Sequence, residues 1–297
     1  MELRHLRYFV TVAEELHFGH AAQRLRIAQP PLSQQIRQLE EELGVQLFLR
    51  TRRSVSLTEA GVAFLVEAQR VLEQAKHAIE VAQRTDRGER GQLIIGFVGS
   101  ATYGLLPKLL HRFRERFPDV TLVLHELTTG QQIQALHEQR IHLGVLRHPV
   151  AQDSLMTEAF TREALIVALP EQHHLATQKS LSLSALAGEP FVLFPRHLGA
   201  GLYDHILSLC QQAGFSPRVT QEAIQMQTMV GLVAAGFGIC LVPASLQQLR
   251  QEGVVYCELN EAPACVELAL AWRRDDTTPV LCTFLDLVRE ALATTNN

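Results

Sequence analysis

Residues 18–53 contain a pattern that very few folds satisfy. Apolar residues recur at helical spacing in two short runs, within residues 21–25 and within residues 32–43. The four residues 26–29 between the runs are about as long as the connection of a helix-turn-helix. Two consecutive prolines then indicate a sharp start to the second helix, because proline lacks the N–H that a first helical turn leaves unpaired. This segment predicts a DNA-binding helix pair.

A basic hairpin is predicted to follow at residues 45–57, where two apolar segments flank an arginine-rich tip. Residues 20–56 hold six arginines and three glutamates, so this segment is net +3 in a chain of net −4. Such a tip suits phosphate or a narrow minor groove, and the first turn of a recognition helix presents polar side chains to base edges. A charge cluster alone is more often a solvated loop, but the combined pattern favours DNA binding. The predicted contacts are Gln29, Pro30, Pro31, Ser33, Gln34, Arg37, Arg50, Arg52 and Arg53.

A long helix without proline is predicted from Thr58, its capping residue, to about Arg87. Its apolar residues occupy heptad a and d positions, which suits pairing with a second copy of the helix. A single helix that packs on its own domain needs the same stripe, and this alternative stays open. A polar, glycine-containing hinge follows at residues 86–91. The residues of the stripe are Leu65, Ala68, Leu72, Ala75, Ile79 and Ala82.

From Gln92 onward, short apolar runs alternate with helical segments, as is typical of an α/β fold. Strands are predicted at residues 93–98, 120–126, 143–146, 164–169, 191–194, 219–221, 239–243 and 266–272. Helices are predicted at residues 105–117, 131–138, 202–213, 226–235 and 278–292.

Polar residues follow the first three predicted strands, and in an open α/β sheet such positions meet at one edge. Ser100 and Thr102 follow the first strand, Thr128 and Thr129 end the second, and Arg147 ends the third. An arginine there can clamp a carboxylate with two parallel hydrogen bonds. The alternatives are a simple helix cap at Ser100 and a surface ion pair at Arg147. We expect a binding site for a small carboxylate.

Composition excludes several classes of protein. The five cysteines are odd in number and include no C-x-x-C pair, so we expect buried thiols and neither a zinc site nor a disulfide framework. The beginning of the chain is unlike a secretory signal, and the most apolar run, residues 230–244, is too short to span a bilayer. No phosphate loop, metal cluster or paired-carboxylate motif indicates catalysis. We expect a cytoplasmic protein without cofactor, metal or membrane partner.

The first sixty residues resemble the LysR-type transcriptional regulators. The residues that carry the resemblance are Leu6 and Phe9; Phe18, Ala21, Ala22 and Leu25; QPPLSQQIRQLE from Gln29 to Glu40; Leu47, Phe48 and Arg50; and Leu57, Thr58, Ala60 and Gly61. The sequence departs from many family members at Gln34, where they carry arginine.

The resemblance implies an N-terminal all-α winged helix-turn-helix (residues 1–58), a long dimerisation helix (59–88) and an α/β effector domain (92–297) like the two-lobed, type 2 periplasmic binding proteins. The chain would cross between lobes near Arg162 and Glu267. Lobe one would then comprise residues 92–162 and 268–297, and lobe two residues 163–267. The resemblance also implies a homotetramer built as a dimer of dimers, with RNA polymerase as a further partner.

Within the family, the segments IGFVGS (95–100), GLLP (104–107) and GLVAAGFGICLVPAS (231–245) look most like regulators that sense benzoate or muconate. That subgroup implies effector contacts at Ser100, Thr129 and Arg147. The loop at residues 198–203, with Tyr203, would close from the second lobe. This loop departs from the aromatic-acid regulators, which favours a carboxylate over an aromatic effector.

The sequence therefore predicts a DNA-binding transcriptional regulator that responds to a small carboxylate and is not an enzyme. One alternative is a regulator with a vestigial cleft that needs no effector. Another, less favoured, is a solute-binding or enzymatic protein on the same two-lobed scaffold.

Overall fold

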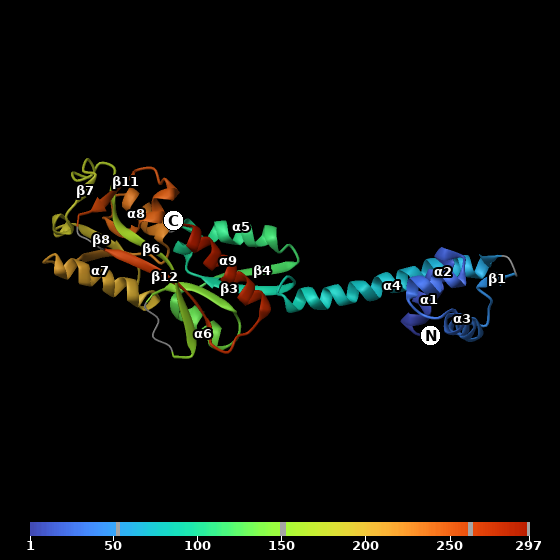
Figure 1. The fold of residues 1–297 in the computed structure, drawn as a ribbon. Helices are drawn as coiled ribbons and strands as arrows, with labels where there is room; N and C mark the ends of the chain where they lie inside the picture. Colours follow the sequence, from blue (N-terminus) through green and yellow to red (C-terminus); the bar gives the residue numbers. More distant parts are fainter. Residues whose placement is uncertain (52–53, 149–152, 261–263, 296–297) are drawn as a thin grey trace. The chain divides into compact units, whose positions relative to one another are not determined.

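The computed structural model describes residues 1–51, 54–148, 153–260 and 264–295. They form two compact units, which divide after Arg84. The first unit contains the N-terminal helices and a small hairpin, and the second contains the sheets (Figure 1). Among the described residues, no helix is both long and apolar enough to cross a membrane.

The first unit is a small helical bundle with a two-stranded wing. Its elements are α1 (Leu3–Glu15), α2 (Phe18–Leu25), α3 (Gln29–Leu43), β1 (Phe48–Arg50), β2 (Val55–Leu57) and most of α4 (Glu59–Asp86). Phe9 is fully buried at the centre, where its ring packs against Phe48 and Phe64. Small, buried Ala21 and Ala22 let α2 pack closely against its neighbours.

The turn between α2 and α3 is one residue shorter than the sequence predicts. Gln29 already belongs to α3, so the connection is residues 26–28. Arg26 has a φ of 53° and closes α2 in the left-handed conformation, where its N–H bonds carbonyls of the last turn. The two prolines occupy the first turn of α3, as predicted.

Glu40 fixes the wing to the end of α3. One carboxylate oxygen accepts hydrogen bonds from the backbone N–H groups of Leu47 (2.9 Å) and Phe48 (3.1 Å). The other accepts from the Arg50 guanidinium at 2.6 Å, and that guanidinium also lies over the Phe18 ring. Because Leu47 and Phe48 are buried, their N–H groups have no access to water and depend on this acceptor.

Helix α4 packs on the first unit along only part of its length. The Thr58 hydroxyl accepts from the Gly61 N–H at 2.8 Å and caps the helix, as predicted. Leu65, Ala68 and Leu72 pack into the core of the first unit. The same stripe continues to Ile79, which is 59% exposed. The alternative of a helix lying on its own domain therefore accounts for the first half of the stripe only.

The second unit alternates strands and helices (Figure 1). Its strands are β3 (Gly91–Phe97), β4 (Val120–Glu126), β5 (Leu143–Arg147), β6 (Leu155–Pro170), β7 (Ser180–Leu181), β8 (Pro190–Leu193), β9 (Arg218–Glu222), β10 (Cys240–Pro243), β11 (Val254–Leu259) and β12 (Cys265–Arg273). Its α-helices are α5 (Leu106–Arg116), α6 (Thr129–His137), α7 (Ala200–Gln212), α8 (Met226–Ala234) and α9 (Pro279–Thr295).

Two long strands, β6 and β12, pass through both halves of this unit. Near one end β6 pairs with β12, and near the other it pairs with β10 and β11. Arg162 and Glu267 are register partners on these two strands and form an ion pair at 3.3 Å. The buried residues form separate cores on either side of this point.

We call the half with β3, β4 and β5 lobe one, and the half with β8 to β11 lobe two. In lobe one, β4, β3 and β5 are parallel neighbours, and β12 joins β5 antiparallel. Helices α5 and α9 lie side by side (Figure 1). They share one core with this sheet, whereas α6 packs into another. The rings of Phe113 and Phe284 join α5 to α9 at 5.1 Å.

Three expectations from the sequence need correction. The strand predicted at residues 164–169 is only the second half of β6, because the first half alternates polar and apolar residues and lacks a continuous apolar run. Strands β7 and β11 were not predicted. Of the cysteines predicted to be buried, Cys265 is half-buried and Cys282 is exposed.

Glu40→Ala should destabilise the first unit by about 2–4 kcal/mol, because it leaves two buried N–H groups without an acceptor. Chemical denaturation of the full-length chain measures this change. Glu41→Ala is the matched control, because Glu41 is exposed and its removal should change stability by less than about 0.5 kcal/mol. Equal unfolding midpoints for the two variants would contradict the proposed fixing of the wing.

Candidate functional site

The three strand ends that the sequence predicts to converge do meet in lobe one. Ser100 follows β3, Thr128 and Thr129 follow β4, and Arg147 is the last residue of β5. All three strands are parallel and adjacent, so their carboxyl ends lie at one edge of the sheet. A cavity of about 420 Å³ opens at this edge, and residues of lobe two form its other wall.

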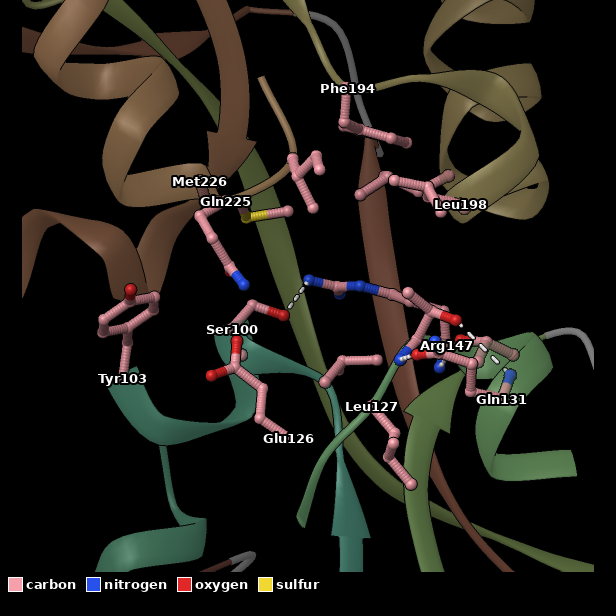
Figure 2. Close-up of a pocket in the computed structure, with 17 residues that line it drawn as sticks. Ser100, Tyr103, Glu126, Leu127, Gln131, Arg147, Phe194, Leu198, Gln225 and Met226 are labelled. Atoms are coloured by element: carbon pink, nitrogen blue, oxygen red, sulfur yellow. Dashed lines mark hydrogen bonds between the residues drawn. The ribbon is translucent and has the colours of Figure 1, made fainter. Parts of the chain in front are cut away.

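Among the described residues, Arg147 is the only cation that lines this cavity. Its Nη2 donates to the Ser100 hydroxyl at 2.7 Å, whereas its Nη1 is buried and has no hydrogen-bond partner among the described residues (Figure 2). Burial lowers the pKa of Arg147 to about 10, and the Glu163 carboxylate partly opposes this shift. The side chain therefore remains cationic at neutral pH and is incompletely solvated.

The threonines at the strand ends have different local roles. The Thr129 hydroxyl accepts from the Arg147 backbone N–H at 3.2 Å, and the Thr128 hydroxyl caps α6 by accepting from the Gln131 N–H. Both residues line the cavity. Thr102 does not line it: its hydroxyl donates to the Gly99 carbonyl at 2.6 Å within the 3-10 helix Gly99–Tyr103.

Lobe two contributes an apolar wall. Figure 2 shows Phe194 and Leu198 across the cavity from Ser100 and Leu127. Tyr203 does not line the cavity, because its ring packs edge-on against Phe194 at 6.1 Å and joins the core of lobe two. The lobe-two residues that line the cavity are Phe194, Leu198, Gly199, Leu202, Ile224, Gln225 and Met226.

Sequence reasoning did not identify four polar residues of the cavity. Tyr103, Glu126, Gln131 and Gln225 all line it. Glu126 ends β4 directly before Leu127, so the rule that selected Thr128 and Thr129 also applies to Glu126. Gln225 precedes α8 in lobe two, and the sequence contains no signal that brings it to lobe one.

The buried side-chain amide of Gln132 links the ends of two of these strands. Gln132 is fully buried, and its Nε2 donates to the carbonyls of Leu127 (2.9 Å) and Val145 (3.3 Å). A Cβ at Gly96 would lie 3.1 Å from Gln132 Cγ, and one at Gly144 would lie 2.9 Å from its Oε1. Glycine at both positions therefore gives the amide the space to join β4 to β5.

The predicted DNA-contacting residues lie on the open side of α3. The helix buries Leu32, Ile36 and Leu39, so the polar residues between them face outward. Arg50 is different, because Glu40 and Phe18 hold its guanidinium at the base of the wing. Arg52 and Arg53 lie outside the described residues. Of the predicted contacts on α3, Gln29, Pro30, Pro31, Gln34 and Arg37 are exposed, and Ser33 is half-exposed.

One group in lobe two has the composition of a metal site: His173, His174 and Glu189. The Leu175 N–H donates to His173 Nδ1 at 3.3 Å, so the ring proton is on Nε2, which faces a Glu189 oxygen at 3.2 Å. A histidine–carboxylate hydrogen bond accounts for this group without an ion.

Comparison with known proteins identifies both units. The family described as "Bacterial regulatory helix-turn-helix protein, lysR family" matches residues 3–62, and the "LysR substrate binding domain" matches residues 86–293. The chain is 43% identical to the HTH-type transcriptional regulator AlsR of Bacillus subtilis (strain 168) over 287 residues, which are 97% of this chain and 95% of AlsR.

Similar solved structures include full-length members of the same family. CbnR, a LysR family transcriptional regulator, has a TM-score of 0.89 and 31% identity over 97% of this chain and 100% of CbnR. Full-length CbnR in complex with its target DNA has a TM-score of 0.84 and 30% identity over 98% and 99% of the two chains. The BenM effector binding domain with its effector benzoate has a TM-score of 0.62 and 29% identity over 69% of this chain and 93% of that domain.

These matches extend along almost the whole chain, and they agree with the helix-turn-helix and the two-lobed unit. The family predicted from the sequence is thus confirmed: the chain belongs to the LysR family of transcriptional regulators, with an N-terminal DNA-binding domain and a substrate-binding domain.

Proposed function

We propose that this regulator responds to a small carboxylate bound at Arg147. The observation that carries the proposal is the buried Nη1 of Arg147, which has no partner among the described residues. A carboxylate can accept from Nη1 with one oxygen and from the Ser100 hydroxyl with the other. Such charge-assisted bonds are about twice as strong as neutral ones, and they relieve the desolvation of the cation.

The effector would act by changing how the two lobes are held relative to each other. Its polar contacts come from lobe one, and Phe194 and Leu198 come from lobe two. A ligand that touches both lobes binds one arrangement more tightly than another, and only this difference in affinity can shift their equilibrium. The effector-independent alternative predicts no such ligand.

The DNA-binding unit would read base edges with the first turn of α3. Gln29, Ser33 and Gln34 lie there with polar side chains that suit major-groove recognition. CbnR, which shares this fold, has been solved with its target DNA. We propose that Arg37, Arg50, Arg52 and Arg53 contact phosphates.

Pairing of two chains through α4 would bring two such units to one DNA site. Ile79 continues the apolar stripe beyond the core of the first unit, and it is exposed in the single chain. Because exposed apolar stripes on long helices are typical of helix pairing, we propose a dimer through α4 and a tetramer made of two such dimers.

The carboxylate proposal predicts that at least one acid of a panel raises the melting temperature of the full-length protein. Arg147→Met should abolish this rise, and it should leave the ligand-free protein as stable or more stable, because it removes an incompletely solvated cation and keeps the apolar stem. Thermal shift measures both effects. The control is Arg140→Met, since Arg140 lies on the surface away from the cavity. A carboxylate that stabilises Arg147→Met as much as the wild type would contradict the proposal.

Gln34→Ala should reduce discrimination between the operator and single-base variants of it by about 1–3 kcal/mol, while non-specific affinity changes little. The measurement is binding to the region upstream of the protein's own gene at fixed salt concentration. Gln23→Ala, an exposed change on α2, is the control. Uniform weakening on every DNA sequence would instead assign Gln34 to a phosphate contact.

Ile79→Glu should shift the protein towards smaller species in sedimentation velocity, because two buried carboxylates would face each other across a paired helix. Gln74→Glu adds the same charge at an exposed position on another face of α4 and should leave the distribution unchanged. If both variants sediment like the wild type, α4 does not pair through this stripe.

A further inference from the structure

The cavity at Arg147 also holds a negative charge. Glu126 lines it from the end of β4, and among the described residues its carboxylate forms no ion pair or hydrogen bond. Figure 2 shows Ser100 between the Arg147 guanidinium and the Glu126 carboxylate. The two charges therefore face one cavity without neutralising each other.

The Glu126 carboxylate lies beside the segment that follows β3. A Cβ built at Gly99 would be 2.6 Å from Glu126 Oε1 and 3.1 Å from Gln225 Oε1, so both oxygens lie over this glycine. Gly99 directly precedes Ser100, whose hydroxyl bonds Arg147. The acceptor oxygens of Glu126 and Gln225 thus lie next to the segment whose Ser100 hydroxyl bonds the Arg147 guanidinium. The same charge on Glu126 adds to the effect of burial in raising the pKa of Tyr103.

The polar and apolar parts of the cavity come from different lobes. Arg147, Ser100 and Glu126 belong to lobe one, while lobe two provides mainly apolar side chains. A ligand that fits this division has a carboxylate and a cationic group close together at one end, and an apolar group at the other. The apolar residues of lobe two are Phe194, Leu198, Leu202, Ile224 and Met226.

We propose that the effector is an α-amino acid with an apolar side chain. Its carboxylate binds Arg147 and Ser100, its ammonium group binds Glu126, and its side chain packs against the apolar wall of lobe two. This inference rests on the proposed carboxylate function and narrows it. It excludes dicarboxylates, because a second carboxylate at this end would meet the uncompensated charge of Glu126.

The test compares amino acids with their deaminated analogues on full-length protein. The amino acids are L-valine, L-leucine, L-methionine and L-phenylalanine, and the analogues include 4-methylpentanoate for leucine and 3-phenylpropanoate for phenylalanine. Succinate and glutarate represent dicarboxylates, and L-leucinamide lacks the carboxylate. Thermal shift identifies ligands, and calorimetric titration then gives their affinities.

We expect at least one of the four amino acids to bind, and its deaminated analogue and its amide to bind at least tenfold more weakly, as loss of one charge-assisted contact implies. Glu126→Gln should weaken amino-acid binding roughly tenfold and affect the analogue much less. Glu115→Gln removes the same charge from exposed Glu115 on α5 and should change neither affinity.

The outcomes separate the two proposals. If deaminated acids or dicarboxylates bind as tightly as the amino acids, or if Glu126→Gln weakens both ligand types equally, the amino-acid inference is wrong and the carboxylate proposal stands. If no acid of any kind binds to the wild type, the carboxylate proposal itself fails, and the amino-acid inference fails with it.

Discussion

The pairing of β6 with β12 is the constraint on which the effector-binding unit depends. These strands connect the lobes, and their register places Arg162 opposite Glu267 at the crossing. The register shifts between Leu268 and Ala269, and Leu268 is also the partner of Arg147 on β5. Arg147, the cation of the cavity, thus pairs with β12 directly beside this register shift, within the strands that connect the lobes. A ligand held there would act where the lobes join.

In the DNA-binding unit, one carboxylate determines the position of the wing. Glu40 accepts from two buried N–H groups and from Arg50, so one carboxylate sets the wing relative to the recognition helix. Arg50 therefore has a structural task beside any contact with DNA. Both residues fix the position of the wing relative to α3, and through that position they would influence how the unit meets DNA.

The sequence predicts elements best where periodicity and special residues agree. The start of α3 at two prolines, the Thr58 cap and the strand at Val120–Glu126 all follow from local rules. The predicted strand covers only residues 164–169 of the long strand β6, because the first half of β6 alternates polar and apolar residues. In the candidate site, Ser100, Thr128, Thr129 and Arg147 line the cavity, since parallel strands bring their ends together.

The remaining residues of the site depend on contacts between segments far apart in the chain. Tyr203 belongs to the predicted loop, yet it packs on Phe194, and Leu198 and Leu202 reach the cavity in its place. Thr102 lies in the same 3-10 helix as Ser100, but its hydroxyl donates to the Gly99 carbonyl and it does not line the cavity. Gln225 approaches Gly99 only because the lobes face each other, which no local pattern encodes.

We propose that Arg147 holds the effector through its buried Nη1, which has no partner among the described residues. A crystal structure of the full-length protein with a carboxylate that stabilises it tests this most directly. We expect one carboxylate oxygen within hydrogen-bond distance of Nη1 and the other near the Ser100 hydroxyl. A carboxylate bound elsewhere, with Nη1 still lacking a partner, would contradict it.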